Sequence, residues 1–376
     1  MALPIIFGAI PFGLLIDRYS RARLLFLFAI SNVIGSLLTA AVTEFHTLLI
    51  ARSLVGLTST TTQVAACSML SDLCPPSRRG RATMAIAVGQ YAGVSAAFAL
   101  GGLLLRYLPS GASSWRTAMY VLAIPMTLAA LAILAMREPA RLGVQISRPA
   151  IGDVGKELWR YKRVIVPLVL ALTAAEMGVG SVFVWAGPSL ARSFGLTPDH
   201  IGEIMALAMI VTGVLGPVAG GSLADACHRL GGPRKTVLAL GTLALISAPL
   251  GLFAQTPSAT IASSLLVVFL ITVSAALVAG NTLFTIVIPN ELRGLCISIL
   301  GSVTTLFSSG VAPVAISLLS EQLGGSTMIG KSLSLVCGGM CLISAACFAL
   351  SARCIDRPAL EGKDEPHTRS MHREHA

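Results

Sequence analysis

The sequence predicts an all-helical membrane protein built from two similar helical bundles. Its 376 residues are 55% hydrophobic and only 12% charged, and the mean hydropathy is +0.81. A soluble domain carries about twice as much charge, roughly 25%. Long apolar runs recur along the chain, and loop sequences of its first part return in its second part. Together these observations exclude a water-soluble globule and indicate repeated membrane-spanning helices.

The apolar runs define eleven predicted membrane helices. Most have about the 20 residues that a helix needs to cross a bilayer. The segment "AQTPSA" around Pro257 divides one long charge-free run into two spans. The predicted spans are residues 2–16, 24–43, 53–71, 82–105, 117–136, 164–191 and 204–224, two spans within 236–290, and residues 294–320 and 332–352.

Basic residues predict the orientation and the domain boundaries. Most of the 27 lysines and arginines fall in alternate loops, and cytoplasmic loops carry such an excess. The C-terminus is therefore expected in the cytoplasm, and the net charge of +10 reflects orientation and contact with the lipid bilayer rather than nucleic-acid binding. The predicted domains are an N-terminal bundle (1–136), a cytoplasmic linker with the basic interfacial segment "KELWRYKR" (137–163), a C-terminal six-helix bundle (164–352) and a polar cytoplasmic tail (353–376).

Two pairs of loops repeat between the halves. The segment "GLLIDRYSRAR" ends the first apolar run, and "GGSLADACHR" ends a run in the second half. The segments "CPPSRRGRA" and "IPNELRGLC" form the second pair. At constant spacing, Gly13, Asp17 and Arg21 align with Gly221, Asp225 and Arg229, and Arg79 aligns with Arg293. The same loops therefore occur in the same order in both halves.

These segments resemble the major facilitator superfamily. "GLLIDRYSR" resembles its signature loop between the second and third helices, and "ARSLVG" resembles its fourth-helix motif. More narrowly, "DLCPPSRRGRA", "VWAGPSLARSFGL" and "IPNELRG" resemble the bacterial spinster-like branch, which is associated with lysophospholipid and sphingolipid-type substrates. The resemblance implies two pseudo-symmetric bundles of twelve helices in all. Because one helix precedes the signature loop here, the chain is expected to hold family helices 2 to 12 and to lack the first.

The resemblance also implies a conformational role for the repeated loops. Asp17 is expected to dock on the eleventh family helix and Asp225 on the fifth, in the outward-facing state. A carboxylate there accepts hydrogen bonds from a helix N-terminus and favours its dipole. The glycines would allow close helix approach. The predicted gating residues are Gly13, Asp17, Arg18, Arg21, Arg79, Gly221, Asp225, Arg229 and Arg293. The alternative is that these arginines only set the membrane topology and that the aspartates beside them are solvated.

Two ionisable residues lie within predicted spans, Arg52 and Glu176. Such residues are costly in lipid and normally face a cavity or a partner. In the family fold the first, fourth, seventh and tenth helices line the central cavity. The predicted substrate or proton cavity therefore comprises Arg52, Ser59, Gln63, Glu176, Asn281 and Thr285, of which several share helix stripes. For the uncharged members, hydrogen bonding between helices is the alternative.

The proton-coupling acids of the spinster-like branch are not where the resemblance expects them. Ser59 stands where relatives usually carry a glutamate, and the acid of the first helix has no counterpart. Glu176 is then the candidate at membrane depth. It can carry a proton, or it can pair with a cationic group of the substrate or with Arg52.

The predicted function is secondary active transport of a small amphipathic or lipid-like solute by alternating access, with protons as the candidate coupling ion. The protein is expected to act as a monomer in the bacterial inner membrane. A drug or metabolite proton antiporter is one alternative, although "GVSAAFALGG" lacks the Gly-Pro of the antiporter motif. A truncated or non-transporting relative is another. No enzyme activity, cofactor or metal site is predicted, because the sequence holds no nucleophile–base set and no CxxC pair.

Overall fold

The computed structural model describes residues 19–73, 79–108, 114–136, 162–287 and 290–355, and every regular element within them is helical. The N-terminal half contains α2 (Arg21–Ala41), α3 (Phe45–Leu73), α4 (Arg79–Tyr107) and α5 (Ser114–Ile133). The C-terminal half contains α7 (Lys162–Phe194), α8 (Pro198–Leu250), α9 (Ala259–Val287), α10 (Asn290–Thr305), α11 (Ala312–Leu323) and α12 (Ile329–Ile355). A π-helical segment, η3 (Leu306–Val311), joins α10 to α11, and the short 3-10 turns η2 (Phe253–Gln255) and η4 (Ser326–Met328) precede α9 and α12.

Within the described residues, nine helical stretches are long and apolar enough to cross a membrane. They correspond to nine of the predicted spans. The predicted span 53–71 is also helical, as part of the 29-residue α3, but its serines and threonines lower its hydropathy. The predicted span 2–16, the linker up to residue 161 and the tail from residue 356 lie outside the described residues. The all-helical class is thus confirmed, and the number of eleven spans is not.

The predicted loop between residues 224 and 236 is much tighter than expected. Helix α8 is assigned as continuous over 53 residues, which as one straight rod would measure about 80 Å. It instead reverses at Gly232, whose φ is +67°, and Lys235 Nζ donates to Leu230 O at 2.6 Å across the turn. Both ends of α8 lie at one end of the bundle, since Gly330 meets Ser193, just before α8, and Ala254, just after it. The two membrane spans of α8 are Pro198–Cys227 and the segment that begins at Gly232.

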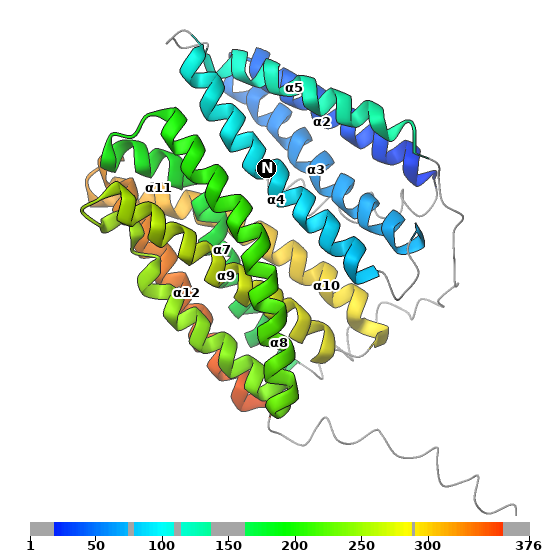
Figure 1. Cartoon of the computed structure of the whole chain (residues 1–376), viewed down its shortest axis with the longest axis vertical. Coiled ribbons are helices and arrows are strands. Elements are labelled where there is room, and N and C mark those ends of the chain that lie inside the picture. The colour runs from blue at the N-terminus through cyan, green and yellow to red at the C-terminus, as the bar shows by residue number, and fades with distance from the viewer. Residues whose placement is uncertain (1–18, 74–78, 109–113, 137–161, 288–289, 356–376) are drawn as a thin grey trace, which may run out of the picture.

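Figure 1 shows α2, α3 and α5 grouped on one side, with α4 between them and the C-terminal half. In the C-terminal half, α7 packs against α9, α11 and α12. Its buried face joins two apolar clusters, one of which contains Leu168 and Leu172 and the other Val182 and Ala186. A smaller cluster of Leu24, Leu25, Phe28 and Met69 holds α2 to α3.

One end of the helices is called the outer end, and the opposite end is the inner end. Helices α2, α4 and α7 end at the outer end, and α3, α5, α8, α9 and α12 begin there. Arg116 Nη2 in α5 donates to Val42 O after α2 at 3.1 Å, which ties two of these termini together. The sequence predicts that the inner end faces the cytoplasm.

Candidate functional site

The two halves meet along α4 and the first span of α8. Ser95 Oγ in α4 donates to Ala206 O in α8 at 2.7 Å. Further in, the ring of Tyr91 packs directly against Gly213, and its hydroxyl lies 3.5 Å from Ser274 Oγ in α9. Tyr91 therefore inserts between two helices of the opposite half.

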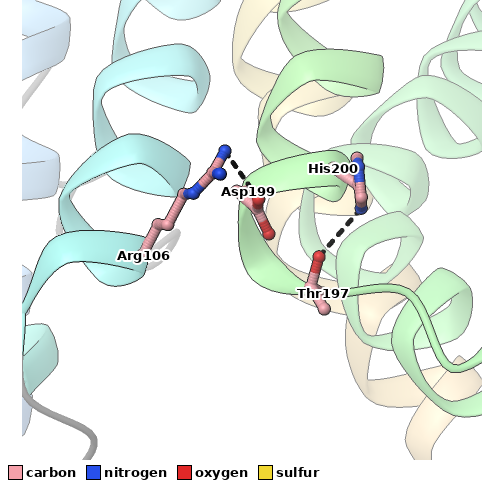
Figure 2. A network of polar contacts seen from close by, with 4 residues as sticks. All are labelled: Arg106, Thr197, Asp199 and His200. Carbon is pink, nitrogen blue, oxygen red and sulfur yellow. Dashed lines mark hydrogen bonds and ion pairs between the residues drawn. The ribbon is translucent and has the colours of Figure 1, made fainter.

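At the outer end an ion pair joins the halves. Arg106 Nη1 near the end of α4 lies 3.4 Å from Asp199 Oδ2 in the first turn of α8 (Figure 2). In the same turn, Thr197 Oγ1 and His200 Nδ1 lie 2.9 Å apart. Thr197 is the N-cap of α8, and Pro198 follows it at the start of the helix, where proline is favoured because its fixed φ suits a first turn.

Glu176 lies in the C-terminal half at about the depth of the contact between Tyr91 and Ser274. On α7, Leu172 packs against Gly280 of α9, and Gly178 meets Phe269 of α9. Glu176 lies between these two contacts, and because the helices are antiparallel it is level with the region around Ser274. It is half-buried, and no hydrogen bond or ion pair joins its carboxylate to another described residue. This lone acid can therefore bind a proton or a cation.

Asn281 lies on the same helix as Ser274 but nearer the inner end. Ser274 on α9 faces Tyr91 of the opposite half, and Asn281, seven residues later, lies on the same stripe of the helix. Asn281 is exposed. It therefore faces the N-terminal half about 10 Å further toward the inner end. The side chain of Thr285 lies outside the described part of the structure.

Ser59 takes part in helix packing in the N-terminal half. Asn32 Nδ2 of α2 donates to Ser59 Oγ, and Ser59 Oγ donates to Val55 O at 2.7 Å. This corresponds to the helix-to-helix hydrogen bonding that was the alternative to a cavity role. Arg52 is half-buried two turns nearer the outer end and forms no ion pair with Glu176 or another described acid. The side chain of Gln63 is not among those described.

The expected gating residues of the second half lie at the inner end. Asp225 and Arg229 are exposed, and Arg229 Nε donates to the backbone oxygen of Asp225 at 3.3 Å. The close helix approach expected at Gly221 is one residue away in this conformation. A Cβ at Gly221 would meet nothing within 4 Å, whereas one at Gly220 would overlap Ala275 O of α9. Gly220 is therefore the packing glycine.

The remaining predicted gating residues either lie outside the described residues or have side chains that the structure does not describe. Gly13, Asp17 and Arg18 lie outside the described residues. Helices α2, α4 and α10 begin at or just before Arg21, Arg79 and Arg293 respectively, but the side chains of these three arginines are not described. The first signature loop therefore keeps its predicted role as a hypothesis.

The contact between the halves was not predicted from the sequence. The sequence pattern that could have indicated this contact has two parts. One is a stripe on α4 whose residues follow one another at spacings of four, three, four and four, and the other is a facing stripe on α8 rich in small residues. The two stripes are Tyr91, Ser95, Phe98, Gly102 and Arg106 on α4, and Asp199, Gly202, Ala206 and Gly213 on α8.

A sequence model of the Major Facilitator Superfamily matches residues 1–188 and 168–372. The two matches together cover almost the whole chain, so this protein belongs to the Major Facilitator Superfamily, a family of integral membrane transport proteins. The predicted family membership is confirmed.

Individual relatives are more distant. The chain is 28% identical over 247 residues to a probable 4-methylmuconolactone transporter of Cupriavidus pinatubonensis, a match that covers 62% of this chain and 54% of that protein. It is 30% identical over 95 residues to the solute carrier family 2, facilitated glucose transporter member 10 of Danio rerio, covering 25% and 18%. The matched regions thus span about half or less of these relatives.

Solved structures share the fold over most of the chain. A bacterial homologue of the human lysosomal transporter Spinster, in an inward-facing and unoccupied conformation, superposes with a TM-score of 0.75 at 20% identity, covering 92% of this chain and 85% of that one. A D-xylose–proton symporter gives a TM-score of 0.68 at 18% identity, covering 92% and 84%.

Proposed function

We propose that this protein is a secondary transporter that moves a small amphipathic or lipid-like solute by alternating access, coupled to protons through Glu176. Glu176 and Asn281 would line the substrate or proton site in the C-terminal half, and Arg52 would face it from the N-terminal half. The observation that carries the proposal is the position of Glu176. An acid without a partner among the described residues lies at the depth where Tyr91 meets Ser274 across the two halves.

The lipid-like substrate is supported by the spinster-like sequence segments and by the fold shared with the bacterial Spinster homologue. We expect the purified full-length chain in proteoliposomes to exchange internal unlabelled lysophospholipid for external labelled lysophospholipid. D-xylose should not compete. If lysophospholipid exchange stays at the level of empty liposomes while another solute is exchanged, the substrate class is wrong and the transport mechanism stands.

A second candidate is that the protein is a drug or metabolite proton antiporter whose substrate is a small lactone or organic acid. It is favoured by the match to the probable 4-methylmuconolactone transporter, which covers more of this chain than the other curated match. The same exchange assay with a labelled muconolactone distinguishes the two. Exchange of the lactone without exchange of the lysophospholipid would establish this second candidate.

We also propose that the repeated loops stabilise closure of the inner end. Asp17→Asn, and its repeat partner Asp225→Asn, should each slow transport by about tenfold, because a carboxylate at a partly buried helix terminus contributes up to about 2 kcal/mol. Substrate binding should persist, since the change weakens one conformational contact and leaves the binding site intact. Initial transport rates and equilibrium binding, measured on the same preparations, check both parts.

The exposed outer-end residue Glu44 provides a matched control. Glu44→Gln removes a similar charge far from the inner end and should transport at the normal rate. Wild-type rates for both aspartate variants would instead mean that the aspartates only mark the topology.

A further inference from the structure

We infer that α4 and the first span of α8 form an outer gate, and that the Arg106–Asp199 ion pair is its latch. The inference rests on the proposed alternating access and adds the device that holds the outer end shut. In such a mechanism the halves must separate at the outer end before solute can enter or leave on that side. The contacts that resist this separation therefore set the fraction of closed protein.

In the gate, the backbones of α4 and α8 come into direct contact at two glycines, Gly102 and Gly202. A Cβ at Gly102 would lie 2.9 Å from Pro198 O and 3.0 Å from Gly202 Cα. A Cβ at Gly202 would lie 2.7 Å from Phe98 O. Backbone atoms cannot turn aside as side chains do, so only glycine at both positions allows this approach, as in other close helix pairs of membrane proteins.

The latch closes over this pair at the outer end. Arg106 is one turn beyond Gly102 on α4, and its side chain is 57% exposed, whereas that of Asp199 is 16% exposed. The first turn of α8 carries the positive end of the helix dipole, which stabilises the carboxylate of Asp199 there. Figure 2 shows Arg106 reaching from α4 across to this turn. An exposed arginine can leave its partner readily, as a reversible latch requires.

Among the described side chains, the contact stops at Tyr91 and is not found nearer the inner end. Val88, one turn inward of Tyr91 on α4, is 43% exposed. On α8, Gly221 lies two turns inward of Gly213 and has no atom within 4 Å of a Cβ position. The described contact between α4 and α8 is therefore confined to the outer half, as expected of a gate and not of a permanent interface.

The glycine pair can be tested with one added methyl group. Spin labels at Glu44→Cys and Gln322→Cys, in a background without native cysteines, report the distance between the outer ends of the halves. These two positions are exposed and distant in sequence from the gate. With the full chain in lipid nanodiscs, Gly102→Ala should raise the ratio of open to closed outer ends by about tenfold, because overpacking a tight contact is destabilising.

Gly101→Ala is the matched control, since a Cβ at the adjacent Gly101 meets nothing within 4 Å. It should leave the outer distance unchanged. Equal distance distributions for the two alanine variants would overturn the gate.

The latch is tested by removing and reversing its charges. Arg106→Ala should raise the open-to-closed ratio about twofold to fivefold, the range expected for an exposed ion pair. Arg106→Asp combined with Asp199→Arg should restore part of the closed population. Arg192→Ala is the control, because exposed Arg192 at the outer end bonds to Ser326 O within its own half, and it should have no effect.

The same outer distance in Arg106→Ala as in the wild type would overturn the latch. These measurements need neither substrate nor flux. A failure of the gate in the distance distributions is therefore distinguishable from a failure of the proposed transport in the exchange assay.

Discussion

Replacing Glu176 with glutamine is expected to abolish pH-driven transport while exchange of substrate without a gradient continues. Glutamine keeps the size and much of the hydrogen bonding of glutamate but neither titrates nor carries charge. Glu176 has no partner among the described residues, so the substitution breaks no described contact. Uptake driven by a pH gradient and counterflow at equal pH, measured in the same proteoliposomes, separate the two activities.

Glu203 provides the control for this experiment. It is an exposed acid near the start of α8, and Glu203→Gln should retain pH-driven uptake. If both activities persist in Glu176→Gln, Glu176 is structural and the proposed proton coupling is wrong. Loss of substrate binding itself would make Glu176 a substrate contact and would favour a cationic or zwitterionic solute.

Substituting valine for Gly220 is expected to destabilise the C-terminal half. A Cβ at Gly220 overlaps Ala275 O and lies 3.0 Å from Ala275 Cα in α9. Forcing α8 away from α9 should cost about 1 to 3 kcal/mol, the usual range for an overpacked contact. The midpoint of thermal unfolding in detergent should fall by several degrees.

The neighbouring glycine gives the opposite pattern. A Cβ at Gly221 meets open space, so Gly221→Val should unfold at the wild-type temperature. The signature loop predicts that another helix closes against Gly221 during transport. If so, Gly221→Val should transport more slowly than the wild type although its unfolding temperature is unchanged. Equal unfolding temperatures for Gly220→Val and Gly221→Val would contradict the packing described for α8 and α9.

The helices were largely predictable because lipid imposes a length and a composition on each span. The reversal between residues 224 and 236 was predicted, but its tightness was not. The charges of Asp225 and Arg229 suggested that the helix ends there, but helical hydrogen bonds are satisfied within the segment, so a helix can extend past the hydrocarbon. The chain turns at Gly232, whose φ is +67°, directly before Pro233.

The candidate site was predictable only where a single residue carries the signal. Glu176 stands out because an acid within an apolar span is rare. The role of Ser59 depends on Asn32, and that contact requires the register of α2 against α3. The Arg106–Asp199 pair requires the relative placement of the two halves, which no local pattern specifies. The packing register between helices therefore decides these contacts, and a local sequence pattern does not contain it.

Alternating access requires the two halves to move against each other around a site between them. The most direct test measures two distances in the full chain in nanodiscs, an outer one between Glu44→Cys and Gln322→Cys and an inner one between Met136→Cys and Leu230→Cys. These four residues are exposed near the two ends of the helices. As pH or solute is varied, we expect the outer distance to lengthen when the inner distance shortens. Distances that stay fixed, or that lengthen together, would contradict alternating access.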